Sequence, residues 1–135
     1  MLACVFSVVV VIFVLVFSRE SLTTVGGRFM DALMRHDTVA LTKMSMMKGL
    51  TDEQIQKEWD ESVNVAAKYY MFAYHIDGAS QSGDTLGSIR MKVIKDIDHP
   101  GSYDENFELP MVKVGDAWKV DVRSISHEMF PGLPR

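Results

Sequence analysis

The first eighteen residues, MLACVFSVVVVIFVLVFS, contain no Asp, Glu, Lys, Arg or His. From Leu2 to Phe17 the only polar side chain is that of Ser7. Because an α-helix rises 1.5 Å per residue, about 17 such residues span roughly 25 Å, at the short end for the hydrocarbon core of a bilayer. The stretch predicts a single transmembrane anchor over residues 1–18, followed by a polar domain.

A cleaved secretory leader is the alternative interpretation of the same stretch. The VFS sequence before Arg19 offers a small residue at which a peptidase could cut. Against cleavage, the positively charged region that normally begins a signal peptide is missing. We therefore expect a permanent anchor, while a secreted domain without its first eighteen residues stays open. Cys4 precedes the apolar run instead of following it, so Leu2–Cys4 does not predict a lipoprotein signal.

Composition excludes several function classes. The 135 residues are 47% hydrophobic and 24% charged, as in a single globular domain. The formal net charge of −4 lies entirely after residue 18 and no basic cluster occurs, so nucleic acid is not an expected partner. A lone cysteine excludes an internal disulfide. The four histidines lack ligand spacing and no haem, phosphate-loop or dinucleotide motif is present, so we expect no metal and no cofactor.

Apolar residues recur with a helical period up to residue 65. They predict three helices over residues 19–37, 38–46 and 51–65. Thr51 and Gln54 have the spacing of a capping box at the start of the third helix.

The first helix carries one apolar stripe, formed by Leu22, Val25, Phe29 and Leu33. Gly26 and Gly27 interrupt it, and each weakens a helix by about 1 kcal/mol relative to alanine, so we expect a kink or break there. Asp37 suits the N-cap of the second helix. The third helix aligns Ile55, Trp59 and Val63 on one face.

From Tyr69 the period changes to two, which predicts strands over residues 69–76, 88–95 and 107–125. Gly115-Asp116 is a hairpin turn signal inside the last range. Pairing outward from this turn places four pairs opposite one another: Val114 and Ala117, Lys113 and Trp118, Met111 and Val120, Leu109 and Val122. Pro110 cannot donate to a ladder and indicates an edge or a bulge.

The expected fold class is α+β, with an N-terminal transmembrane helix and then three helices packed on a curved four-stranded antiparallel sheet. The expected division is an anchor over residues 1–18, the α+β domain over residues 19–126 and an extended tail over residues 127–135.

The order of the helices, the strand sequence YYMFAYHIDGAS and the terminal hairpin VGDAWKVDVRSIS resemble the nuclear-transport-factor-2-like superfamily of cone-shaped domains. The resemblance covers roughly residues 20–126. It implies a fold more than a function. Anchored members of this superfamily include an inner-membrane subunit of type IV secretion systems and proteins associated with mycobacterial lipid importers.

Catalytic members of the superfamily, such as ketosteroid isomerase and scytalone dehydratase, bind an apolar substrate inside the cone. The residues that would line such a pocket here are Tyr70, Phe72, Tyr74 and Trp118. None of them matches the isomerase pattern closely enough to be assigned a catalytic role. His75 and Asp77 share the opposite strand face, which is typical of a solvated surface.

The tail ends in two prolines and a glycine, which prevent regular structure. Its apolar residues, Met129, Phe130 and Leu133, either fold back as a strap over the domain or dock on a neighbouring protein. Both interpretations stay open.

We expect a non-catalytic accessory subunit that braces a larger membrane complex, either energy-transducing or part of a secretion machine. Its partners would be the lipid bilayer and other transmembrane subunits. The alternative is a membrane-tethered cone for an apolar small molecule. The resemblance favours a bacterial inner membrane with the domain in the periplasm, whereas Arg19, Arg28 and Arg35 after the apolar stretch favour a cytoplasmic domain.

Overall fold

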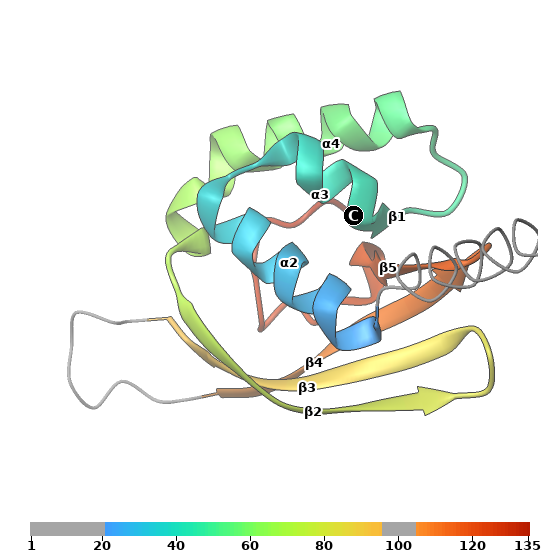
Figure 1. Ribbon diagram of the computed structural model, residues 1–135. Coiled ribbons are helices and arrows are strands. Elements are labelled where there is room, and N and C mark those ends of the chain that lie inside the picture. Colours follow the sequence, from blue (N-terminus) through green and yellow to red (C-terminus); the bar gives the residue numbers. More distant parts are fainter. Residues whose placement is uncertain (1–20, 96–104) are drawn as a thin grey trace, which may run out of the picture.

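The computed structural model describes residues 21–95 and 105–135. In these residues, three α-helices lie on one side of a five-stranded sheet, so the domain is α+β (Figure 1). The anchor expected over residues 1–18 falls outside the described ranges. Within those ranges, no helix is both long enough and apolar enough to cross a bilayer.

The helices begin at the caps that the sequence predicts. Helix α3 (Thr38–Met44) begins after Asp37, whose carboxylate accepts the Ala40 amide at 3.1 Å. Helix α4 (Asp52–Ala66) has the full capping box, in which Thr51 Oγ1 accepts the Gln54 amide and the Thr51 amide donates to Gln54 Oε1.

Helix α2 (Leu22–Arg35) continues without a break through Gly26 and Gly27, so the predicted break is wrong. Gly26 lies against the sheet, where a Cβ would be only 2.1 Å from Ile89 Cδ1. The glycine therefore allows a close helix–sheet approach and does not end the helix.

The sheet has the order β1-β5-β4-β3-β2. Its strands are β1 (Ser45–Met46), β2 (Ala73–Ser82), β3 (Leu86–Ile94), β4 (Glu105–Val114) and β5 (Ala117–Asp121). The predicted sheet of four antiparallel strands is incomplete, because the short β1 pairs in parallel with β5 and makes the sheet mixed.

Strand β1 replaces the end of the predicted 38–46 helix. Ser45 is buried, and its hydroxyl donates to the Leu41 carbonyl at 2.6 Å while accepting from Trp59 Nε1 at 2.9 Å. These two bonds join α3 to α4 through Ser45. The chain leaves α3 in an extended conformation there, beside Val120 of β5.

The predicted hairpin register is confirmed for the three pairs nearest the turn, Val114–Ala117, Lys113–Trp118 and Met111–Val120. The Leu109–Val122 pair is wrong, because β5 ends at Asp121 and Val122 begins a 3₁₀ turn (Val122–Ser124). Pro110 faces Ser88 of β3 and lies one residue before the ladder with β5 begins, so its missing N–H interrupts no pair with β5.

The predicted 69–76 strand also begins later than expected. Residues Ala67–Tyr70 form a 3₁₀ turn, and β2 starts only at Ala73. Asp77 is an extra residue between Ile76, which faces Met91, and Gly78, which faces Arg90, and so forms a β-bulge.

The core lies between the helix layer and the inner face of the sheet. Phe29 of α2 and Trp59 of α4 are fully buried, with ring centroids 5.8 Å apart in an edge-on arrangement. From the sheet, Ile89, Leu109 and Val120 are equally buried.

Candidate functional site

Three of the four predicted pocket residues lie together, and the fourth does not. Tyr70 and Phe72 are buried, and Tyr74 beside them is half-buried, with its ring centroid 6.3 Å from that of Phe72. Trp118 belongs to β5 and lies in a separate groove with residues of α2 and α3. The structure therefore does not bring the four side chains into one pocket.

The C-terminal tail occupies the space beside these aromatic residues. The Phe130 ring centroid lies 4.8 Å from that of Phe72 and 6.3 Å from that of Tyr70. The Tyr70 hydroxyl donates to the Gly132 carbonyl at 3.1 Å. Met129 and Phe130 are fully buried, and Leu133 is 4% exposed. The tail is thus the folded-back strap, and its three apolar side chains are part of the domain core.

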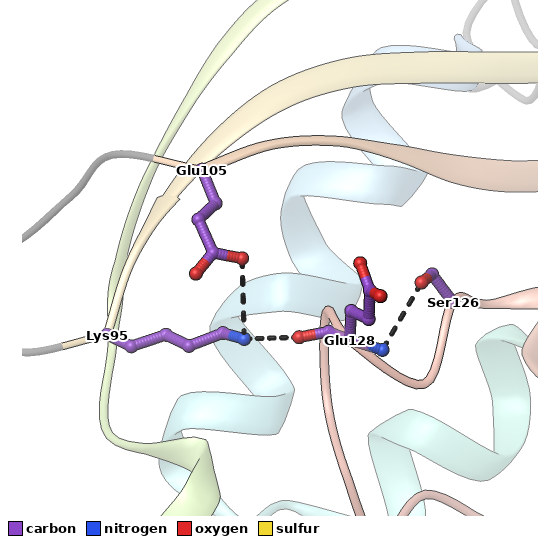
Figure 2. A network of polar contacts seen from close by, with 4 residues as sticks. All are labelled: Lys95, Glu105, Ser126 and Glu128. Atoms are coloured by element: carbon purple, nitrogen blue, oxygen red, sulfur yellow. Dashed lines mark hydrogen bonds and ion pairs between the residues drawn. The ribbon is translucent and has the colours of Figure 1, made fainter.

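Lys95, the residue after β3, contacts both this strap and strand β4 (Figure 2). The Lys95 ammonium donates to the Glu128 carbonyl and lies 3.9 Å from Glu105 Oε2. It also lies 5.2 Å from the Phe107 ring centroid. The Glu128 amide donates to Ser126 Oγ at 3.2 Å, which turns the tail toward the lysine. We call Lys95, Glu105 and the Glu128 carbonyl the clasp.

Sequence reasoning missed the clasp, although a signal was present. Met91 and Val93 are buried on the inner face of β3, and Lys95 follows them with the same period of two. A lysine that continues a row of buried side chains needs a hydrogen-bond acceptor on that face of the sheet. Here the acceptor is the Glu128 carbonyl of the tail.

The hydroxyls of Tyr70 and Tyr74 have raised pKa values. Burial raises the pKa of Tyr70 from 10.0 to about 12, and the positive charge of Arg135 partly opposes this shift. Burial also raises the pKa of Tyr74 to about 12, and its bond to Asp31 and the negative charge of Asp31 add to the shift. The Tyr74 hydroxyl lies 2.8 Å from Asp31 Oδ1 and 3.0 Å from the Gly27 carbonyl. Both tyrosines therefore act as neutral donors that hold neighbouring elements.

His75 and Asp77 lie on the outer face of the sheet, as their position in the sequence predicts. The two side chains are 3.6 Å apart, and that of His75 is 75% exposed. Asp77 lines an open hollow of about 410 Å³ together with Arg90 and Glu108, which are also exposed. This is a solvated pair on the surface and does not form a buried acid–base site.

A second hollow lies between α2, α3 and the β4–β5 hairpin. Its volume is about 460 Å³. It is lined by Val25, Arg28, Ala40, Lys43, Met44, Asp116, Ala117 and Trp118. We call this hollow the Trp118 groove. The sequence predicts Trp118 opposite Lys113 in the hairpin but does not indicate which helix residues would lie against it.

No cluster of three or more potential metal ligands occurs in residues 21–95 and 105–135. Among known proteins, no family model matches the chain and no curated protein matches it significantly.

Proposed function

We propose that the chain is a single-pass, non-catalytic accessory subunit that braces a larger membrane complex. The observation that carries this proposal is the filling of the domain interior by its own tail. Phe130 occupies the position beside Tyr70 and Phe72 that a bound apolar molecule would need, and the clasp holds the tail in place. A domain filled in this way acts through its surface.

The sequence before the domain supports a role at a membrane. The charge-free stretch ends at Ser18, and only two residues of sequence separate it from Ser21, which caps α2. The Ser21 hydroxyl accepts the Thr24 amide at 3.2 Å, and Leu22 and Val25 then pack into the domain. A short connection of this kind would transmit the position of an anchor to the domain, as bracing requires.

The resemblance to anchored nuclear-transport-factor-2-like domains supports the same proposal. The α+β arrangement of helices on a curved sheet is compatible with that superfamily (Figure 1). By analogy with its anchored members, we place the chain in a bacterial inner membrane with the domain in the periplasm. The complex would be energy-transducing or part of a secretion machine.

The ligand-binding or isomerase-like alternative has weaker support. It requires an open space lined by Tyr70, Phe72 and Tyr74, whereas Phe130 already contacts the first two rings. It would also require the tail to leave, which breaks the hydrogen bond between Tyr70 and Gly132 and opens the clasp.

Affinity purification from native membranes tests the accessory role. The full chain carries a tag on a flexible linker after Arg135, membranes are solubilised gently, and retained proteins are identified by mass spectrometry. We expect a fixed set of membrane subunits that an unrelated single-pass protein with the same tag does not retain. Recovery of the full chain alone from the same membranes would contradict the proposal.

A further inference from the structure

The Trp118 groove combines an apolar floor with a positively charged border. Val25 is 5% exposed, and Met44 and Trp118 are half-buried. Arg28 and Lys43 line the same groove, and Lys113 Nζ lies 5.8 Å from the Trp118 ring centroid. An apolar floor with cations above it fits an amphiphile whose head group is anionic.

The charge of this surface differs from that of the molecule. Arg28 and Lys43 line the groove and Lys113 lies beside its Trp118 ring, whereas Asp116 is the acidic residue that lines it. The chain as a whole has a formal net charge of −4. Positive charge is therefore concentrated at this place, where it attracts an anion at close range and is screened over longer distances.

The groove also lies at the end of the domain that follows the apolar stretch. Val25 is four residues after Ser21, the N-cap of α2, which corresponds to about 6 Å along a helix. Tryptophan, lysine and arginine are the side chains that favour the interface between the hydrocarbon core and water. A membrane that holds residues 1–18 would bring its head groups to this level.

We propose that the Trp118 groove binds an anionic phospholipid of the membrane that holds the chain, with the phosphate near Lys43 and Arg28 and the start of an acyl chain over Trp118. The proposal rests on the membrane attachment proposed above and is independent of the accessory role. Bound lipid would fix the rotation of the domain about its anchor.

Tryptophan fluorescence of the full chain in lipid nanodiscs tests this proposal. One sample contains brominated phosphatidylglycerol in unlabelled phosphatidylcholine, and the other contains brominated phosphatidylcholine in unlabelled phosphatidylglycerol, at equal mole fractions of bromine. Trp59 is fully buried and serves as the unquenched background. We expect the anionic bromolipid to quench Trp118 at least about fivefold more, because each of the two cations near the phosphate enriches an anionic lipid by about this factor. A Trp118→Phe variant must lose this quenching.

Matched charge variants locate the effect. Lys43→Gln and Arg28→Gln should each reduce the preference for the anionic bromolipid, whereas Lys57→Gln, on the exposed side of α4, should leave it unchanged. Equal quenching by the two bromolipids, or equal effects of Lys43→Gln and Lys57→Gln, would overturn the groove proposal while attachment stands. If the chain fails to float with neutral vesicles, membrane attachment itself is wrong, and the groove proposal falls with it.

Discussion

Gly26 and Gly27 are neighbours in α2 and both face the sheet, but only at Gly26 is there no room for a side chain. A Cβ on Gly26 would be 2.1 Å from Ile89 Cδ1, whereas a Cβ on Gly27 would be 3.7 Å from the Tyr74 hydroxyl, an ordinary contact. Replacing either glycine by alanine favours the helical conformation by about 1 kcal/mol. At Gly26 the fully buried Ile89 must move, and such overpacking costs about 1–3 kcal/mol.

We therefore predict opposite effects from two adjacent substitutions. Gly27→Ala should raise the free energy of unfolding by about 0.5–1 kcal/mol. Gly26→Ala should lower it by up to about 2 kcal/mol once the helical gain is subtracted. Urea unfolding, monitored by the fluorescence of buried Trp59, measures both. A change of the same sign in both variants would contradict the close approach of α2 to β3.

The raised pKa values of Tyr70 and Tyr74 predict a loss of stability at alkaline pH. Their pKa values rise from 10.0 to about 12 on folding, so the folded state retains protons that the unfolded state releases. Their contribution is therefore complete below pH 10 and is lost as the pH rises from 10 toward 12.

Substitution by phenylalanine separates this effect from other alkaline titrations. Tyr70→Phe and Tyr74→Phe should each lower stability at neutral pH by about 1 kcal/mol, because each loses a hydrogen bond. The double variant should also show a flatter decline of the urea midpoint between pH 9.5 and 11.5 than the unmodified chain. Identical slopes in the two proteins would show that neither hydroxyl titrates in this range.

At the scale of elements, the sequence predicted the features that depend on neighbours along the chain. The caps of α3 and α4 and the first three pairs of the β4–β5 hairpin depend on residues within a few positions of one another. Strand β1 was missed because two residues carry no periodicity, and its conformation depends on Trp59, fourteen residues away. The 3₁₀ turn at Tyr70 was also missed. The Tyr70 hydroxyl donates to the carbonyl of Gly132, sixty-two residues away, and local periodicity does not report such a contact.

The sequence predicted which kinds of residue would form the candidate site but not how those residues are arranged in space. The sequence identified Tyr70, Phe72 and Tyr74. The alternation of apolar and polar residues along their segment could not indicate that Phe130 of the tail would fill the space beside them. The tail has no periodicity, and its burial follows from contacts with distant residues such as Tyr70 and Lys95.

The tail should therefore behave as a structural element of the core. Phe130→Ala removes a fully buried ring and should lower the free energy of unfolding by about 3–5 kcal/mol. His127→Ala, at an exposed position of the same tail, should change it by less than about 0.5 kcal/mol. Urea unfolding compares the two variants, and binding of a hydrophobic dye should rise only for Phe130→Ala. Equal stability of both variants would mean that the tail is not part of the folded core.

At the scale of the whole molecule, the described residues have two distinct ends. The start of α2, the β2–β3 turn and the β4–β5 turn meet at one end, since a Cβ on Gly87 would lie 2.8 Å from Leu22 Cδ1 and Leu86 faces Val112 (Figure 1). The clasp lies at the opposite end of β3, nine residues from Leu86, or about 30 Å along a strand. An anchor that precedes α2 would place the turns near the bilayer and the tail far from it.

Spin labels at these two ends test this orientation in the full chain. In a Cys4→Ser background, Asp84→Cys places a label in the β2–β3 turn and His127→Cys places one in the tail, both at exposed positions. In vesicles that contain nickel-chelating lipid, paramagnetic relaxation should be strongly enhanced at residue 84 and weak at residue 127, because the enhancement falls steeply over the separation of about 30 Å. The reverse order would place the tail toward the membrane. It would also remove the head groups from the Trp118 groove, because the groove and the β2–β3 turn share the end of the domain at which α2 begins.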